Sequence, residues 1–225
     1  MNRLAQALKA RTPEEQARRR FGLWALVALV VLLPAWWWIG ADLAAAVLKP
    51  VAALFLRLFG LNGQIGALED GGWAIGTDLT HADGRPYVFG MPHEMVKRLL
   101  FGVPLFAAFM IAPPRTDRPV RAVLIGAGVI LVVFLLSVAG VVWGETAPML
   151  NPALAGQAGA GGRLSGEPLH PLAAQVAILG RYLALSVAPL ILAVVTWAAV
   201  NPAGRETLLG GLGDDQGEDP ADAET

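Results

Sequence analysis

Histidine and acidic side chains that could bind a metal lie in two short stretches of the sequence. Asp78, His81 and Asp83 are close together, and His93-Glu94 follows shortly afterwards. A metal site needs ligand atoms that converge at about 2 Å from one ion, and nothing in this spacing requires such convergence. The chain also lacks a His-Glu-x-x-His fingerprint. We therefore expect no metal site; Asp78, His81, His93 and Glu94 are the residues that would form one.

Nucleophilic catalysis has little support in the sequence. The chain has no cysteine, which excludes disulfides, thiolate metal sites and a cysteine nucleophile. Ser137 and Ser186 lie in apolar stretches that contain no histidine to act as a base, so helix packing is the expected role of both hydroxyls. No glycine-rich phosphate loop is present. We expect no catalytic residue and no cofactor.

A second group of ionisable residues flanks three apolar stretches. Glu94, Lys97, Arg98, Glu145 and Arg181 should lie at a similar depth, near the outer boundary of a membrane. Ionisable groups so close to hydrocarbon are costly unless they are paired or hydrated. The main interpretation is a network of ion pairs that holds the helices together. The alternative is contact with a partner or ligand.

The composition places these residues in a membrane protein. The chain has 225 residues, of which 55% are hydrophobic and only 16% charged, whereas charged residues approach about a quarter of a soluble domain. We predict a mainly α-helical integral membrane protein, a four-helix transmembrane bundle with an interfacial helix and a small extracytoplasmic β element. The predicted spans are residues 21–40, 95–112, 122–143 and 182–200.

The first span is the clearest. Phe21 to Gly40 is an uncharged stretch of twenty residues that follows Arg18, Arg19 and Arg20. At about 1.5 Å per residue it covers roughly 30 Å, the thickness of a bilayer's hydrocarbon core. A cleaved signal peptide is the alternative, but its apolar region is usually about 7–15 residues long.

Residues 41–60 are apolar but contain Lys49, Pro50 and Arg57. Burying each cation in mid-span would cost about 2.5–3.5 kcal/mol, so we predict a helix that lies in or dips into the outer leaflet. A short hairpin with the first span is the alternative. Residues 61–92 are richer in glycine and predict a small β element, with a hairpin at Asp83-Gly84. So few residues cannot build a core of their own, and the element should rest on the bundle or on a partner.

The distribution of basic residues predicts the orientation. Residues 1–20 are basic, and residues 113–121 contain three arginines, so both segments should lie in the cytoplasm. Residues 144–170 are predicted to be a flexible outer loop, and the acidic tail, residues 201–225, to be disordered in the cytoplasm. The chain is therefore expected to be a multi-pass protein of the bacterial inner membrane with both termini cytoplasmic. Its expected partners are the lipid bilayer and another membrane protein, with no nucleic acid.

Several short motifs resemble a known family. They are Leu33-Pro34-Ala35-Trp36-Trp37 in the first span, Leu58-Phe59-Gly60 after the interfacial segment, and Gly102-Val103-Pro104-Leu105 in the second span. Together with the order of the segments, they resemble the exosortase H-associated membrane proteins of bacteria over roughly residues 20–200. The Asn-Pro that precedes a Tyr-rich entry to the second span in that family is absent, and Arg85-Pro86-Tyr87 stands there instead.

The resemblance implies a role beside a membrane transpeptidase that processes proteins with a C-terminal sorting signal. Exosortases use a Cys, Arg and His set, and a chain without cysteine cannot act by that mechanism. The first hypothesis is therefore a non-enzymatic accessory protein that binds a membrane partner such as an exosortase. The second is a membrane enzyme or transporter that uses the charged residues at the outer boundary.

Overall fold

The computed structural model describes residues 13–157 and 163–209. The predictions for residues 1–12, for the middle of the outer loop and for residues 210–225 lie outside the described residues. The elements, in chain order, are α2 (Pro13–Ala35), η1 (Trp36–Gly40), α3 (Ala41–Leu58), β1 (Ile65–Ala67), β2 (Trp73–His81), β3 (Pro86–Met91), α4 (His93–Leu99), α5 (Gly102–Ile111), α6 (Pro119–Leu150), η2 (Pro152–Gln157), β4 (Leu164–Ser165), α7 (Pro171–Ser186), α8 (Ala188–Val200) and α9 (Pro202–Leu209).

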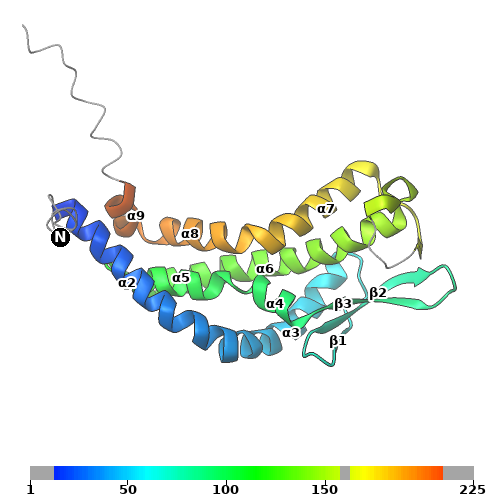
Figure 1. The fold of residues 1–225 in the computed structure, drawn as a ribbon, viewed down its shortest axis with the longest axis horizontal. Helices are drawn as coiled ribbons and strands as arrows, with labels where there is room; N and C mark the ends of the chain where they lie inside the picture. Colours follow the sequence, from blue (N-terminus) through cyan, green and yellow to red (C-terminus); the bar gives the residue numbers. More distant parts are fainter. Residues whose placement is uncertain (1–12, 158–162, 210–225) are drawn as a thin grey trace, which may run out of the picture.

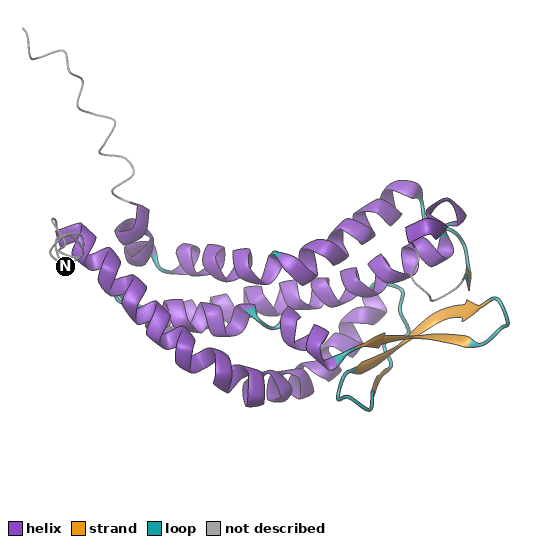
Figure 2. Ribbon diagram, viewed as in Figure 1, coloured by secondary structure: helices purple, strands orange, loops and turns teal. Residues whose placement is uncertain are grey.

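The helices lie along one long axis, with the sheet at one end (Figures 1 and 2). The chain runs toward the sheet as α2 and α3, back as α4 and α5, forward as α6, and back as α7 and α8. At the end away from the sheet, Arg18 Nε donates to Thr207 O (3.1 Å) and Asn201 Nδ2 donates to Pro114 O (3.1 Å). We call this the arginine end and the other the sheet end. Residues 61–92 and 144–170 are the two segments predicted to lie outside. They meet at the sheet end, where β4 pairs with β2.

Long apolar helices confirm the membrane class, but not the count of four spans. Pro13–Leu58 and Pro119–Leu150 are long and apolar enough to cross a membrane, and α7 with α8 makes a third candidate if the bent pair is one span. The predicted span 95–112 is not one helix, because α4 ends at Leu99 and α5 begins at Gly102. Pro104 accounts for the break: it has no N–H to donate to the carbonyl of Leu100 and its ring clashes there.

The other predicted spans also differ from the observed helices. Residues 182–200 cross the junction between α7 and α8, where the chain bends by 71°; Pro189 cannot donate to Leu185 O in a continuous helix. The third helix begins at Pro119 and continues to Leu150, so residues 144–150, predicted to be loop, are helical. The helix continues past the uncharged stretch, and Gly144 and Ala147 of this last part pack against α7.

The first helix is continuous through α2, η1 and α3 and contains 46 residues. Residues 41–58 are helical as predicted, and they do not fold back on the first span as a hairpin. Figure 1 shows the helix bowed, and Pro34 and the π-helical turn η1 are the usual causes of such bending. A Schellman motif ends it: Leu61 N donates to Leu56 O, Gly60 N donates to Arg57 O, and Gly60 has φ +74°.

The sheet is antiparallel, with β2 between β1 and β3 and with β4 paired to the far end of β2. The predicted hairpin joins β2 to β3, and Gly84 has φ +81°. Its loop has one residue more than an Asp-Gly two-residue turn, because His81 N donates to Arg85 O and Gly84 N donates to His81 O. A type I turn followed by a left-handed glycine fits this pattern. Only the turn type therefore differs from the prediction.

The sheet has no separate core and packs on the helices, as its size requires. Trp73 of β2 meets Phe134 of α6 edge to face, with ring centroids 6.0 Å apart. Ile75, Met91 and Phe134 are fully buried in one cluster with apolar residues of α3, α4 and α6. The sheet end is thus fixed to the bundle by α6.

A second apolar cluster lies toward the arginine end. Phe21 of α2, Phe109 of α5 and Trp197 of α8 stack there, with centroids 5.1 to 6.2 Å apart. The acidic tail does not begin directly after α8, because residues 202–209 form α9. Gly204 N donates to the fully buried Asn201 Oδ1 (3.1 Å), which stabilises the start of this short helix.

Candidate functional site at the sheet end

A carboxylate of the first helix joins that helix to α4. Asp42 Oδ1 lies 2.9 Å from His93 Nε2 and 3.4 Å from Lys97 Nζ. His93 and Lys97 are four residues apart in α4, a spacing that places both side chains on one face of a helix. A single carboxylate of the first helix therefore pairs with two residues of α4.

Lys97 is the most buried charge of this cluster, with 10% of its side chain exposed. Its ammonium also donates to Trp37 O (3.0 Å) and lies 5.5 Å from the centre of the Trp37 ring. Trp37 belongs to η1, whose π-helical hydrogen bonding differs from that of the flanking helix. Single π-helical turns occur frequently at functional sites. Here the turn supplies a carbonyl to a cation close to the apolar part of the bundle.

The loop between β1 and β2 holds His93 from the other side. Asp70 accepts hydrogen bonds from Gly72 N (2.9 Å) and His93 N (3.1 Å). These backbone donors, Gly72 first, lower the pKa of Asp70 because they stabilise its charged form. A Cβ on Gly72 would lie 2.4 Å from Met91 O, so only glycine fits there. Asp70 thus fixes the start of α4 by hydrogen bonds to its backbone.

A cleft of about 440 Å³, lined by both charged and apolar residues, opens beside this cluster. Its lining includes Asp42, Lys49, Asp70, Trp73 and His93. The carboxylates and cations lie within one small space, and the arrangement can bind a polar or charged group of a partner at the sheet end. No serine or threonine is among the residues that line the cleft; Ser137 is buried in α6, and Ser186 Oγ donates to Tyr182 O of its own helix.

A second ion pair lies between α6 and α7. Arg181 Nη1 is 2.6 Å from Glu145 Oε2, with 19% and 32% of the two side chains exposed. Gly144 permits this approach, since a Cβ there would lie 2.5 Å from Arg181 Cβ and 2.6 Å from Ala177 O. Burial raises the pKa of the Tyr87 hydroxyl in β3, and the charge of Glu145 raises it further. The pair therefore lies close to the sheet as well.

The five residues of the predicted charge network divide into two groups. Lys97, Glu145 and Arg181 form ion pairs, whereas Glu94 and Arg98 are exposed and form none within residues 13–157 and 163–209. Asp42 and Asp70 were not among the site residues predicted from the sequence. The spacing of His93 and Lys97 is a sequence signal for a common helix face, but the carboxylate that meets them comes from a segment about fifty residues earlier.

The four residues considered for metal binding do not converge. Asp78 and Glu94 are exposed, His81 lies edge to face with Tyr87, and His93 pairs with Asp42. Among the described residues, no group of three or more His, Asp or Glu side chains is arranged to hold a metal ion.

The fold and the ion pairs define a helical membrane protein with a small antiparallel sheet packed on one end of its helices. The family model of the exosortase H-associated membrane proteins matches residues 15–204. The chain therefore belongs to this family, which confirms the resemblance seen in the short motifs. No curated protein and no solved structure matches the chain.

Proposed function

We propose that the protein is a non-enzymatic accessory protein of an exosortase system, and that it binds a membrane-embedded partner through its first helix and its sheet end. Membership of a family described as exosortase-associated supports the choice of partner. The cleft beside Asp42 and His93 supplies charged and polar groups for contact with a partner. An exosortase is the partner that best fits both points.

The exposed apolar surface of the first helix carries this proposal. Only 6% of its most apolar window is buried. Forty-six residues at about 1.5 Å each make a helix of roughly 69 Å, more than twice the thickness of the hydrocarbon core. A helix this long, with large apolar residues such as Leu26, Val30 and Leu43 exposed along it, offers a large surface to lipid and to a neighbouring membrane protein.

The same length supports the placement of α3 at the outer interface, because a straight crossing cannot contain the whole helix. Lys49 and Arg57 can extend their charges into the headgroup layer from there. The proposed orientation places the arginine end in the cytoplasm, with both termini, and the sheet end outside the bacterial inner membrane. The arginines of residues 113–121 and those before Phe21 support it.

Photo-crosslinking in the native membrane tests the partner surface. A photoreactive residue at Val30, which is 65% exposed on α2, should attach to the exosortase, whereas one at Leu124, 68% exposed on α6, should attach much less. Equal crosslinking at both positions, or none at Val30, would contradict the use of the first helix. The two sites are matched in exposure and apolar character, so the helix itself is compared.

The orientation is tested by labelling single cysteines, because the natural chain has none. Cysteine at Asp83, in the hairpin, should react with a membrane-impermeant reagent from the periplasmic side. Cysteine at Thr116, in the loop between α5 and α6, should react only after the membrane is opened. Labelling of both from the same side would refute the orientation.

A membrane enzyme or transporter is the second candidate, favoured by the Asp42–His93 pair at the cleft. Replacing His93, Glu145 or Arg181 with alanine separates the two functions. Loss of protein sorting with normal protein levels, while Val30 still crosslinks to the exosortase, would support direct participation in chemistry or transport. Lower protein levels with proportionate loss of sorting would support the structural role that we propose for these charges.

A further inference from the structure

Within the described residues, three helical passes are interrupted at one level of the bundle. The interruptions are the π-helical turn η1 (Trp36–Gly40), the break between α4 and α5 at Leu100 and Phe101, and the bend between α7 and α8 at Val187. Two contacts place them next to one another. Phe101 lines one apolar hollow with the three tryptophans of η1, and a Cβ on Gly102 would lie 2.9 Å from Pro189 O. We call these three interruptions the break layer.

The two larger apolar clusters of the protein meet at the break layer. Leu100 belongs to the cluster at the sheet end, whereas Phe101 packs against the cluster at the arginine end. The first helix changes from one cluster to the other within residues 29–36, and the bent pair of α7 and α8 does so within residues 185–192. Each half of the bundle therefore has a core of its own, and the two cores are divided where the helices are interrupted.

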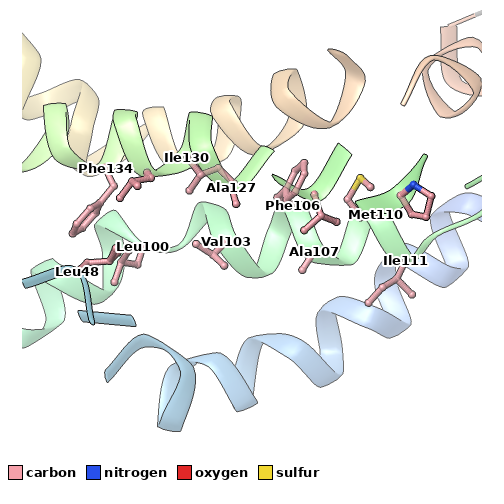
Figure 3. A pocket seen from close by; sticks show the side chains of 13 residues that line it. Leu48, Leu100, Val103, Phe106, Ala107, Met110, Ile111, Ala127, Ile130 and Phe134 are labelled. Atoms are coloured by element: carbon pink, nitrogen blue, oxygen red, sulfur yellow. The ribbon is translucent and has the colours of Figure 1, made fainter. Parts of the chain in front are cut away.

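An apolar groove of about 580 Å³ crosses the same division, between the first helix, α5 and α6 (Figure 3). Leu100 and Phe134 of its lining belong to the sheet-end cluster, and Phe106 and Ile130 belong to the arginine-end cluster. Close packing makes a protein interior resist deformation, and the groove leaves the two halves incompletely packed against each other on this side. The helix α6 crosses the break layer without interruption and joins the two halves.

We propose that the break layer is a hinge, about which the sheet-end half and the arginine-end half of the bundle rotate while α6 joins them. Hinges are a few residues at the ends of elements that absorb the change in φ and ψ. Pro104 and Pro189 suit that role, because each removes a backbone hydrogen bond that would otherwise hold two helical segments in line. Since residues of both halves line the groove, the rotation widens and narrows it.

Lys97 determines to which half the π-helical turn belongs. In an α-helix Ala41 N would donate to Trp37 O, but here it donates to Trp36 O. Lys97 Nζ of α4 donates to Trp37 O (3.0 Å). This hydrogen bond ties η1 and α3 to the sheet-end half. The half that turns against it consists of α2, α5 and α8, whose aromatic and aliphatic side chains share the arginine-end cluster.

Double electron–electron resonance on the full-length protein in lipid nanodiscs tests the hinge, because a chain without cysteine can be spin-labelled at two chosen residues. One pair, Val176 and Val195, spans the bend between α7 and α8; the control pair, Val120 and Leu136, spans the same level on α6. All four side chains are exposed. At the rise of a helix, full straightening of the 71° bend would lengthen the first separation by about 5 Å.

A hinge predicts that the distances between Val176 and Val195 are distributed more widely than those between Val120 and Leu136, with a tail up to about 5 Å longer than the bent form gives. Equally narrow distributions for the two pairs would overturn the proposal, because they would show a fixed bend. The measurement needs no partner, so its failure is distinct from a failure of crosslinking at Val30.

Two proline substitutions test the cause of the movement. Pro189→Ala supplies an N–H that can donate to Leu185 O, so it should narrow the distribution of the first pair to the width of the control pair. Pro171→Ala, in the first turn of α7, should leave it unchanged, because a helix makes no use of that N–H. If Pro189→Ala keeps the wide distribution of the parent, the bend is not the hinge. Should that variant fail to fold, the two label pairs in the parent decide alone.

Gly102→Ala tests the contact between the two breaks. Its Cβ would press on Pro189 O at 2.9 Å, so the Val176–Val195 distribution should shift. Gly128→Ala adds the same methyl group in open space on α6 and should cause no shift. If Gly102→Ala also leaves the distribution where it was, the breaks do not move as one layer, and the single hinge is refuted.

Discussion

The two longest helices of this protein are both apolar, but they have opposite relations to the fold. Only 6% of the most apolar window of Pro13–Leu58 is buried, against 44% for Pro119–Leu150. Large apolar residues such as Leu26 and Val30 face outward on the first helix, whereas α6 carries Phe134 and Val138 into the main core. Apolar composition thus leaves the first helix largely exposed, whereas in α6 nearly half of it serves internal packing.

The contrast between α6 and the first helix also shows which of the two holds the sheet end in place. Because α6 contacts the sheet, α7 and the first helix, it organises the core on several sides. The first helix is attached through a few defined contacts, among them the Asp42 ion pairs and the hydrogen bond from Trp143 Nε1 to Phe59 O (3.1 Å). Substitutions in α6 should therefore affect stability more than equivalent substitutions in the first helix.

The largest effect is expected for Phe134→Ala. The ring is 2% exposed and packs on Trp73, so its removal should lower the free energy of unfolding by about 3–5 kcal/mol. Leu26→Ala, at a residue that is 59% exposed, should change it by less than about 0.5 kcal/mol. Thermal unfolding in detergent measures both. Equal destabilisation would remove the contrast between the two helices.

Gly144→Val tests whether the sensitivity of α6 to substitution is confined to the face that packs against α7. Its new Cβ would lie 2.6 Å from Ala177 O, so α6 and α7 must separate, at a cost of about 1–3 kcal/mol. Gly128→Val makes the same change in the same helix, at a glycine with open space around it. If both variants unfold at one temperature, close packing of α6 on α7 does not contribute to stability.

Asp42→Asn tests the polar attachment of the first helix. The neutral amide leaves the buried Lys97 without its counter-charge, which should cost about 1–2 kcal/mol. Adding Lys97→Met should recover part of this loss, because removing one partner of a buried pair is worse than removing both. The unfolding midpoints of the parent, the single variant and the double variant give the answer. A double variant that is less stable than the single one would show that Lys97 acts mainly through Trp37.

The smallest effect is expected at Asp70, whose carboxylate is solvent-exposed. Its pKa is lowered from 3.8 by backbone donors, so its stabilising contribution is present above that pH and is lost as the pH falls through the folded-state pKa. Asp70→Asn should therefore unfold at a slightly lower temperature than the parent at pH 7. The difference should shrink below pH 4; Asp78→Asn, at another exposed carboxylate of the sheet, is the control for the loss of one surface charge. A constant difference would exclude titration of Asp70 as the cause.

Several features followed from the sequence because they depend on local properties. The length of the uncharged stretch after Arg20 predicted a helix long enough for a membrane, and the His81 to Gly84 segment predicted a hairpin whose glycine has positive φ. The short motifs also predicted the family, over nearly the range that its model matches. The first two signals each lie within a few dozen consecutive residues, and each motif of the family is itself a short run of consecutive residues.

Other features were decided only by tertiary structure. Pro50 and Pro104 are both prolines in apolar segments, yet the helix continues through the first and breaks before the second. Residues 144–150 are helical although their sequence is typical of a loop, because Gly144 allows α7 to pack against them. For residues 144–150, α7 supplies the contacts that offset the local preference; the two prolines differ in burial, since Pro50 is exposed and Pro104 is buried.

The candidate site likewise combines features that the sequence predicted with features that only the tertiary structure decided. The sequence predicted that Lys97, Glu145 and Arg181 need partners, since a charge near hydrocarbon is costly wherever it lies. It did not predict that Lys97 would meet Asp42 and the carbonyl of Trp37, which lies sixty residues earlier. The cost of an unpaired charge is a property of one residue and its local sequence, whereas the identity of its partner depends on how the helices pack.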